Sequence, residues 1–227
     1  MKVQQAFSGA RGVDSLSFSQ AGTLAQAHIL KASGVDYFVG YLGEMTPARL
    51  GIVLAAGLAF MPVTRANRFD GAQAVLECQR LGLPKGCTVW LDLEGREIED
   101  EDWTTASAND RERLASRLIE IINDWARAVA GAGHLPAIYV GSPQPLTADE
   151  LWKLAVVRYW KAYTRVYDRF GRTHDEPTKA GWCQLQLSHG EKLGQLWPPG
   201  NVPNKTLVDV NAIQVDRLGR LPTWIVT

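Results

Sequence analysis

The sequence predicts an α/β fold in which one domain, residues 1–227, forms a single (β/α)8-type, TIM-like barrel. Three observations favour this fold. The chain has 227 residues, close to the length at which one such barrel is complete. Its hydrophobic fraction of 46% is enough for a large buried core. Finally, short β-like runs alternate with longer helical runs, which is the rhythm of parallel strands joined by crossover helices.

Eight β-like runs follow one another along the chain. They cover residues 12–18, 35–43, 57–67, 88–95, 135–142, 158–164, 181–189 and 206–213. An open doubly wound sheet would usually have fewer strands, and it would often carry a Gly-rich phosphate turn after its first strand, which this sequence lacks. We therefore expect the strands to be parallel and to close into a barrel.

Helical patterns lie between the earlier runs, and residues at their ends suit helix termini. Ser19 suits an N-cap and Gly34 a C-terminal stop for the first helix, and Pro47 suits an early helical position in the second. The expected helices run from about Ser19 to Gly34, from Thr46-Pro47, from Asp70 to about Leu81, from about Asp110 to Ala130, and from Thr147 to Leu154. The last three crossovers look irregular, so we expect helices to be missing there.

Composition excludes several classes of partner. The 24 basic and 24 acidic residues balance, which argues against a nucleic-acid partner. An apolar stretch of the ~18 residues needed for a membrane span is absent, and the opening MKVQQAFSGARG lacks the apolar region of a secretory signal. We expect a chain that is cytoplasmic as synthesised and that is released by lysis or a non-classical route. Cysteines and histidines show no ligand spacing, so neither a metal nor another cofactor is expected.

The fourth run, TVWLDLEG, carries two carboxylates on one face. Side chains alternate across a strand, so Asp92 and Glu94 share one face while Val89, Leu91 and Leu93 share the other. If the apolar face packs against the outer helices, the carboxylates point into the barrel. They then lie at the C-terminal end of the strand, where barrel enzymes keep their chemistry. Two close carboxylates also push one pKa upward, which suits a general acid.

The same alternation collects polar and aromatic side chains from other strands. Each has an ordinary structural explanation, such as a cap, a cross-strand hydrogen bond or core packing. Their coincidence at one end favours a pocket for an uncharged, polyhydroxylated ligand and for a cationic, oxocarbenium-like transition state. On the seventh run, Trp182 and Gln186 are also expected to face inward and Cys183 outward. The lumen set consists of Asp14, Asp92, Glu94, Tyr139, Trp160, Gln184 and Asp209.

With these residues in place, the chain resembles the bacterial glycoside-hydrolase-like family called domain of unknown function 1906. It is more distantly similar to the family 25 lysozymes, which are muramidases. The resemblance runs through GVDSLSF, YLG, WLDLEG, IYVGS, YWKAY, WCQLQLS and VDVNAI. It implies that Asp14, Asp92, Glu94 and Asp209 line the site, with Glu94 as the proton donor. The sequence departs from the family pattern at Tyr163, which shifts the parity of the sixth run, and in the seventh run, where Gln-Leu-Gln replaces the expected aromatic.

Two functions stay open at this point. The first is a glycoside hydrolase that cleaves an N-acetylated β-linked glycan such as peptidoglycan, with Glu94 as general acid and Asp92 as an orienting carboxylate. Asp92 acting as nucleophile or as the base for a water remains an alternative. The second function is a non-catalytic carbohydrate-binding barrel that retains the pocket. The carboxylate pair disfavours a structural or cargo role. In either case, the expected glycan contacts are Asp14, Tyr139, Trp160, Gln184 and Asp209.

Overall fold

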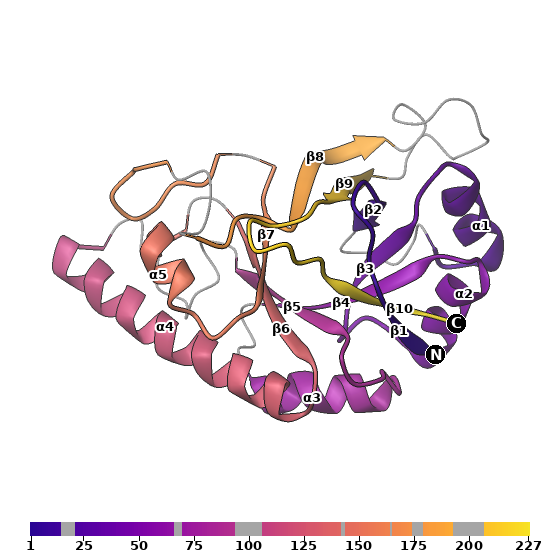
Figure 1. Ribbon diagram of the computed structural model, residues 1–227, viewed down its shortest axis with the longest axis horizontal. Coiled ribbons are helices and arrows are strands. Elements are labelled where there is room, and N and C mark those ends of the chain that lie inside the picture. The colour runs from indigo at the N-terminus through magenta and orange to yellow at the C-terminus, as the bar shows by residue number, and fades with distance from the viewer. Residues whose placement is uncertain are drawn as a thin grey trace.

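A closed barrel of eight strands forms the centre of the molecule (Figure 1). The computed structural model describes residues 1–14, 21–65, 70–93, 106–141, 144–163, 165–173, 179–192 and 207–227. Each barrel strand pairs with the next, and pairings of β4 with β5 and of β9 with β2 close the ring. The predicted fold class is confirmed. The strands are β2 (Arg11–Asp14), β3 (Tyr37–Tyr41), β4 (Ala59–Arg65), β5 (Thr88–Leu93), β6 (Leu135–Val140), β7 (Arg158–Lys161), β8 (Gln184–Lys192) and β9 (Leu207–Ile213).

The last barrel strand departs from the expected direction. Strands β2 to β8 pair in parallel, but β9 runs antiparallel to both of its neighbours. The expectation of uniformly parallel strands is therefore wrong for β9. Side-chain alternation has the same period whichever way a strand runs. The sequence pattern thus assigned the faces of this strand without fixing its direction.

Five described helices connect the strands as far as β7. Each begins after a Thr, Asp or Ser whose side chain accepts a hydrogen bond from a backbone N–H of the first turn, which stabilises the helix start. The first described helix begins after Thr23, in a capping box with Gln26, whereas Ser19, the expected N-cap, lies outside the described residues. The described part of the connection from β7 to β8 contains no helix, as the irregular pattern there indicated. The helices are α1 (Leu24–Ala32), α2 (Pro47–Ala55), α3 (Gly71–Arg80), α4 (Ala108–Gly131) and α5 (Ala148–Trp152).

Two apolar clusters show which way the strand side chains point. The larger cluster joins helix residues such as Leu118 to strand residues such as Val89 and Leu91, so it fills the layer between barrel and helices. The smaller cluster contains Trp90 and Tyr139 but no residue of a described helix, so it fills the barrel interior. The inward and outward faces expected for the fourth and fifth runs agree with this division.

The start of the seventh run is an exception. Cys183 lies in the inner cluster and Trp182 in the outer one, the reverse of the expected alternation. Both residues precede β8, whose first residue is Gln184. Strict alternation holds only inside a regular strand, so it fails for these two positions.

A short antiparallel pair formed by the two chain ends covers one end of the barrel. Strands β1 (Lys2–Gln5) and β10 (Thr223–Val226) pair with each other, and Ile225 pairs with Phe60 near the start of β4. Figure 1 shows both termini together at this side. Trp224 inserts into the inner cluster and packs against the ring of Tyr37, with centroids 5.6 Å apart. The N-terminal end of the barrel is thereby closed, which leaves the opposite end for a site.

Candidate functional site

Asp92 lies at the C-terminal end of β5, on the same strand face as the inward Trp90. The Tyr41 hydroxyl, from the end of β3, donates a 2.7 Å hydrogen bond to Asp92 Oδ2. The Arg65 guanidinium, from the end of β4, lies over the Tyr41 ring at 5.1 Å from its centroid. Three neighbouring strands thus fix the orientation of one carboxylate at the barrel mouth. Glu94, the expected partner of Asp92, lies outside the described residues.

A second carboxylate group lies on the wall formed by β2 and β9. Asp14 and Asp209 stand directly opposite each other in the antiparallel pair. Facing carboxylates repel each other, and each of these receives its own amide donor. Asn211 Nδ2 donates to Asp14 Oδ2 at 2.6 Å, and Gln186 Nε2 donates to Asp209 Oδ2 at 2.7 Å. This register brings together two of the carboxylates that side-chain alternation assigned to the lumen.

Gln186 connects this wall to the opposite side of the mouth. Its Oε1 accepts hydrogen bonds from the Tyr139 hydroxyl at 2.8 Å and from the Tyr163 backbone N–H at 3.1 Å. Its Nε2 holds Asp209. A single buried amide therefore links β6, the end of β7, β8 and β9. Gln186 fixes the position of Asp209 relative to the aromatic side chains.

The aromatic residues expected to bind sugar are mostly buried. Tyr139 and Trp160 pack edge to face, with ring centroids 4.6 Å apart, and Trp160 also meets Trp90 at 5.7 Å. Only 7% of Tyr139 and 4% of Trp160 is exposed. Their rings form the floor of the site and offer little open surface for stacking. Tyr163, two residues after β7, is by contrast 55% exposed.

Gln184 lies deeper than the carboxylates, in register with Trp160 and Ile213. It is fully buried, and neither its Oε1 nor its Nε2 has a hydrogen-bond partner among the described residues. The buried Nε1 atoms of Trp90 and Trp160 likewise have no hydrogen-bond partner among the described residues. Buried polar atoms are normally satisfied by protein or by ordered water. This part of the lumen is therefore suited to bound water or to a polar group of a ligand.

The sequence reasoning missed Tyr41, which holds Asp92. Alternation places Asn211 and Gln186 on inward faces, but neither was given a role in binding or catalysis, and the structure shows that they hold Asp14 and Asp209. A signal for Tyr41 was present, because the run YFVGY alternates and places Tyr37, Val39 and Tyr41 on one face. The hydrogen bonds themselves depend on the register between strands distant in sequence, which one strand's pattern does not contain.

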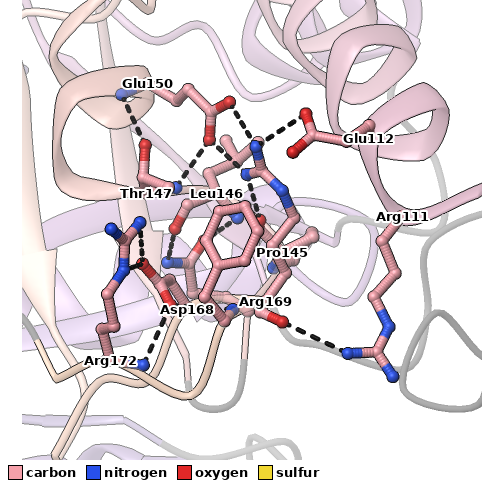
Figure 2. Close-up of polar contacts among 11 residues, drawn as sticks. Arg111, Glu112, Pro145, Leu146, Thr147, Glu150, Asp168, Arg169 and Arg172 are labelled. Atoms are coloured by element: carbon pink, nitrogen blue, oxygen red, sulfur yellow. Dashed lines mark hydrogen bonds and ion pairs between the residues drawn. The ribbon is translucent and has the colours of Figure 1, made fainter. Parts of the chain in front are cut away.

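The polar segment after β7 is anchored beside this rim. Figure 2 shows the buried Arg169 between Glu150 and Glu112. Arg169 donates to Glu150 Oε1 at 2.8 Å, to Glu112 Oε2 at 3.0 Å and to the Pro145 carbonyl at 2.9 Å. Arg111, from the first turn of α4, donates to the carbonyl of Arg169. The described residues 165–173 are thus fixed against α4 and α5.

The described residues contain no cluster of three or more metal-ligating side chains. None of the described helices is both long and apolar enough to cross a membrane.

Comparison with known proteins concerns the fold. No protein-family model matches the chain, and no curated protein matches it. An uncharacterized protein of B. stearothermophilus is similar over 94% of this chain and 100% of its own, with 16% identity and a TM-score of 0.58. A family 25 glycosyl hydrolase of Streptococcus pneumoniae is similar over 90% of this chain and 87% of its own, with 12% identity and a TM-score of 0.46. Likeness at such identity bears on fold alone, so the family resemblance of the motifs stays a prediction.

Proposed function

We propose that this protein is a glycoside hydrolase acting on an N-acetylated β-linked glycan such as peptidoglycan. The observation that carries the proposal is the Asp92 carboxylate, which Tyr41 holds at the C-terminal end of β5. Carboxylates gathered at the C-terminal end of barrel strands suit a cationic, oxocarbenium-like transition state. Amide and hydroxyl groups beside them suit a neutral, hydroxyl-rich ligand.

Glu94 is the general acid in this proposal. It comes two residues after Asp92 in the chain, and an alternating strand would place both carboxyl groups on one face. Glu94 gives its proton to the glycosidic oxygen as the bond to the anomeric carbon breaks. The repulsion of a nearby carboxylate favours the protonated form of such an acid.

Asp92 orients the 2-acetamido group of the substrate. Residues on one strand face lie on the same side of the scissile bond, which disfavours Asp92 as a nucleophile from the opposite side. The acetamido oxygen instead attacks the anomeric carbon while its N–H donates to Asp92. Water then opens the cyclic intermediate, giving up a proton to Glu94 and leaving a product of retained configuration. Asp14, Asp209 and Gln184 bind hydroxyl groups of the glycan, and Tyr139 and Trp160 support the site from below.

The proposal predicts large losses of turnover at the two carboxylates. Glu94→Gln is expected to reduce turnover by about 10²–10⁴-fold, the usual contribution of a positioned acid. Asp92→Asn should cause a comparable loss, with both variants folded by circular dichroism. The measurement is hydrolysis of purified peptidoglycan and of matched 2-acetamido and 2-hydroxy oligosaccharides, with product configuration by NMR.

Asp124→Asn is the matched control, because this carboxylate is exposed on α4. It should retain the full rate. Wild-type turnover by Glu94→Gln would show that the acid is misassigned. Cleavage of the 2-hydroxy series, or an inverted product, would exclude acetamido participation. Glycan binding without cleavage by the wild-type protein would favour the alternative, a carbohydrate-binding barrel.

A further inference from the structure

A pocket of about 130 Å³ opens beside the barrel mouth, separate from Asp92. The loop after β3, the end of β4 and the first half of α3 form its walls. Tyr41 lines the pocket, and its hydroxyl also contacts Asp92. The pocket is therefore one side chain away from the candidate catalytic centre. Its other lining residues are Leu42, Gly43, Glu44, Val63, Thr64, Arg65, Asp70, Gln73, Ala74 and Glu77.

The charged groups of the pocket already have partners in the protein. Glu77 pairs with Arg80 at 2.6 Å and accepts from Gln73 Nε2 at 2.9 Å. Asp70 caps α3 by accepting from two backbone N–H groups, and this carboxylate occupies the helix N-terminus where an anion could otherwise bind.

The balance of charge in the lining disfavours an anionic ligand. Among the described residues, three carboxylates line the pocket against one guanidinium, that of Arg65, which lies 4.0 Å from Glu44 and over the Tyr41 ring. An added negative charge would face more carboxylates than cations. Because each carboxylate has a partner, a cationic ligand gains little here. The pocket suits an uncharged group.

The remaining lining provides both apolar and hydrogen-bonding surface. Leu42, Val63 and Ala74 are buried apolar residues, while Gln73 and Thr64 carry polar groups. The volume is below the ~300–1,000 Å³ of a site for a whole drug-sized ligand. A small substituent with a methyl group and an amide fits this combination of size and chemistry.

We infer that this pocket binds the acetamido arm of a sugar residue that adjoins the one held at Asp92. The inference rests on the proposed function and deepens it, because it assigns the pocket the selection of N-acetylated over plain glycans. The methyl group packs against the apolar floor, and the amide meets the polar lining. A sugar that carries a carboxylate is excluded from this position by the acidic lining.

Gly43 allows a direct test. It lines the pocket, a Cβ added there meets no atom within 4 Å, and its φ is not positive. Gly43→Leu therefore adds a bulky apolar side chain at the pocket lining without a clash at the backbone, and Gly43→Ala adds a smaller one. Gly51, exposed on α2 with the same open space at its Cβ, gives Gly51→Leu as the matched control.

The measurement is calorimetric binding of chitotriose and of cellotriose, which differ in their acetamido groups, in a Glu94→Gln background in which turnover is strongly slowed. Gly43→Leu should weaken chitotriose binding about tenfold, the combined worth of a buried methyl group and one hydrogen bond. Cellotriose binding and the Gly51→Leu control should not change. Gly43→Ala should give a smaller loss and keeps the test available if the Leu variant does not fold.

The outcomes separate this inference from the proposed function. Wild-type hydrolysis combined with an unchanged preference for chitotriose in Gly43→Leu overturns the pocket assignment and leaves the hydrolase intact. Selective chitotriose binding that Gly43→Leu removes, without wild-type hydrolysis of any glycan, supports the pocket and overturns the hydrolase. Absence of binding to both trisaccharides overturns the pocket assignment as well.

Discussion

At the scale of single residues, the buried amide of Gln186 determines how the carboxylate wall is held. Gln186→Glu has nearly the same shape, but it replaces the donor to Asp209 with a second carboxylate. At neutral pH the two charges repel each other, and the free energy of unfolding should fall by about 1–3 kcal/mol, the cost of a lost buried hydrogen bond. Lowering the pH lets one carboxyl accept a proton and donate again, so the deficit should shrink. Urea unfolding at pH 7.5 and pH 4.5 measures both effects.

Gln79→Glu, on the exposed side of α3, is the control for adding one negative charge. A Gln186→Glu deficit that is equal at both pH values would mean that Asp209 is not its partner.

Gln186 also shows how much the alternation pattern of a strand can predict. Alternation predicted that Gln186 faces inward, whereas its partners come from three other segments and follow from register.

At the scale of an element, the residues after β7 depend on one buried arginine. Burial by itself raises the pKa of Glu150, but hydrogen bonds from Arg169 and from Thr147 outweigh it, and the net pKa lies below its ordinary value. The unfolded chain therefore binds more protons in acid than the folded one, so stability falls as the pH drops below the ordinary Glu pKa of about 4.3. Glu150→Gln should be less stable at pH 7 and should lose less between pH 5 and pH 3. Guanidinium unfolding across this range tests the slope.

Glu120→Gln, at an exposed position of α4, should keep the wild-type dependence of stability on pH. If stability depends on pH in Glu150→Gln as it does in the wild type, the ion pair between Arg169 and Glu150 is not the acid-sensitive contact. The loss should appear first as accelerated proteolysis near residues 165–173, because these residues are the ones that Arg169 fixes.

A five-residue motif in the segment after β7 recurs after β9. Residues 168–172 read DRFGR and residues 216–220 read DRLGR. In each, the Asp Oδ1 accepts backbone N–H groups two and four residues later, and its Oδ2 pairs with the final Arg. Gly171 and Gly219 both adopt positive φ, as this turn requires. The shared Asp, Gly and Arg positions therefore account for both turns.

At the scale of the whole molecule, the barrel could be predicted because most of its elements follow from local sequence patterns. Strand and helix runs, caps and side-chain faces follow from neighbouring residues. The closing pair β1–β10 joins residues at the two ends of the chain, more than two hundred positions apart, and each strand has four residues. Neither segment was among the expected β-like runs. Their pairing depends on a barrel end that exists only after the rest has folded.

The β1–β10 pair should contribute to stability without affecting ligand binding at the candidate site. Trp224 fills the inner cluster at the N-terminal end of the barrel and is 3% exposed. Trp224→Ala removes a large buried ring, so unfolding should become easier by about 3–5 kcal/mol. The candidate site is at the opposite end, where barrel enzymes carry their active residues. Well below the lowered melting temperature, binding of chitotriose should therefore match the wild type.

Phe7→Ala provides the comparison at the same end of the barrel. Phe7 packs edge to face on Trp224, with centroids 5.5 Å apart, but half of its surface is exposed. Its removal should cost much less, because less apolar surface leaves a buried environment. Thermal unfolding and calorimetric binding of both variants distinguish the two ends of the barrel. If Trp224→Ala weakens chitotriose binding while the protein is fully folded, the β1–β10 pair is coupled to the candidate site. The division of the barrel into a stabilising end and a binding end would then be wrong.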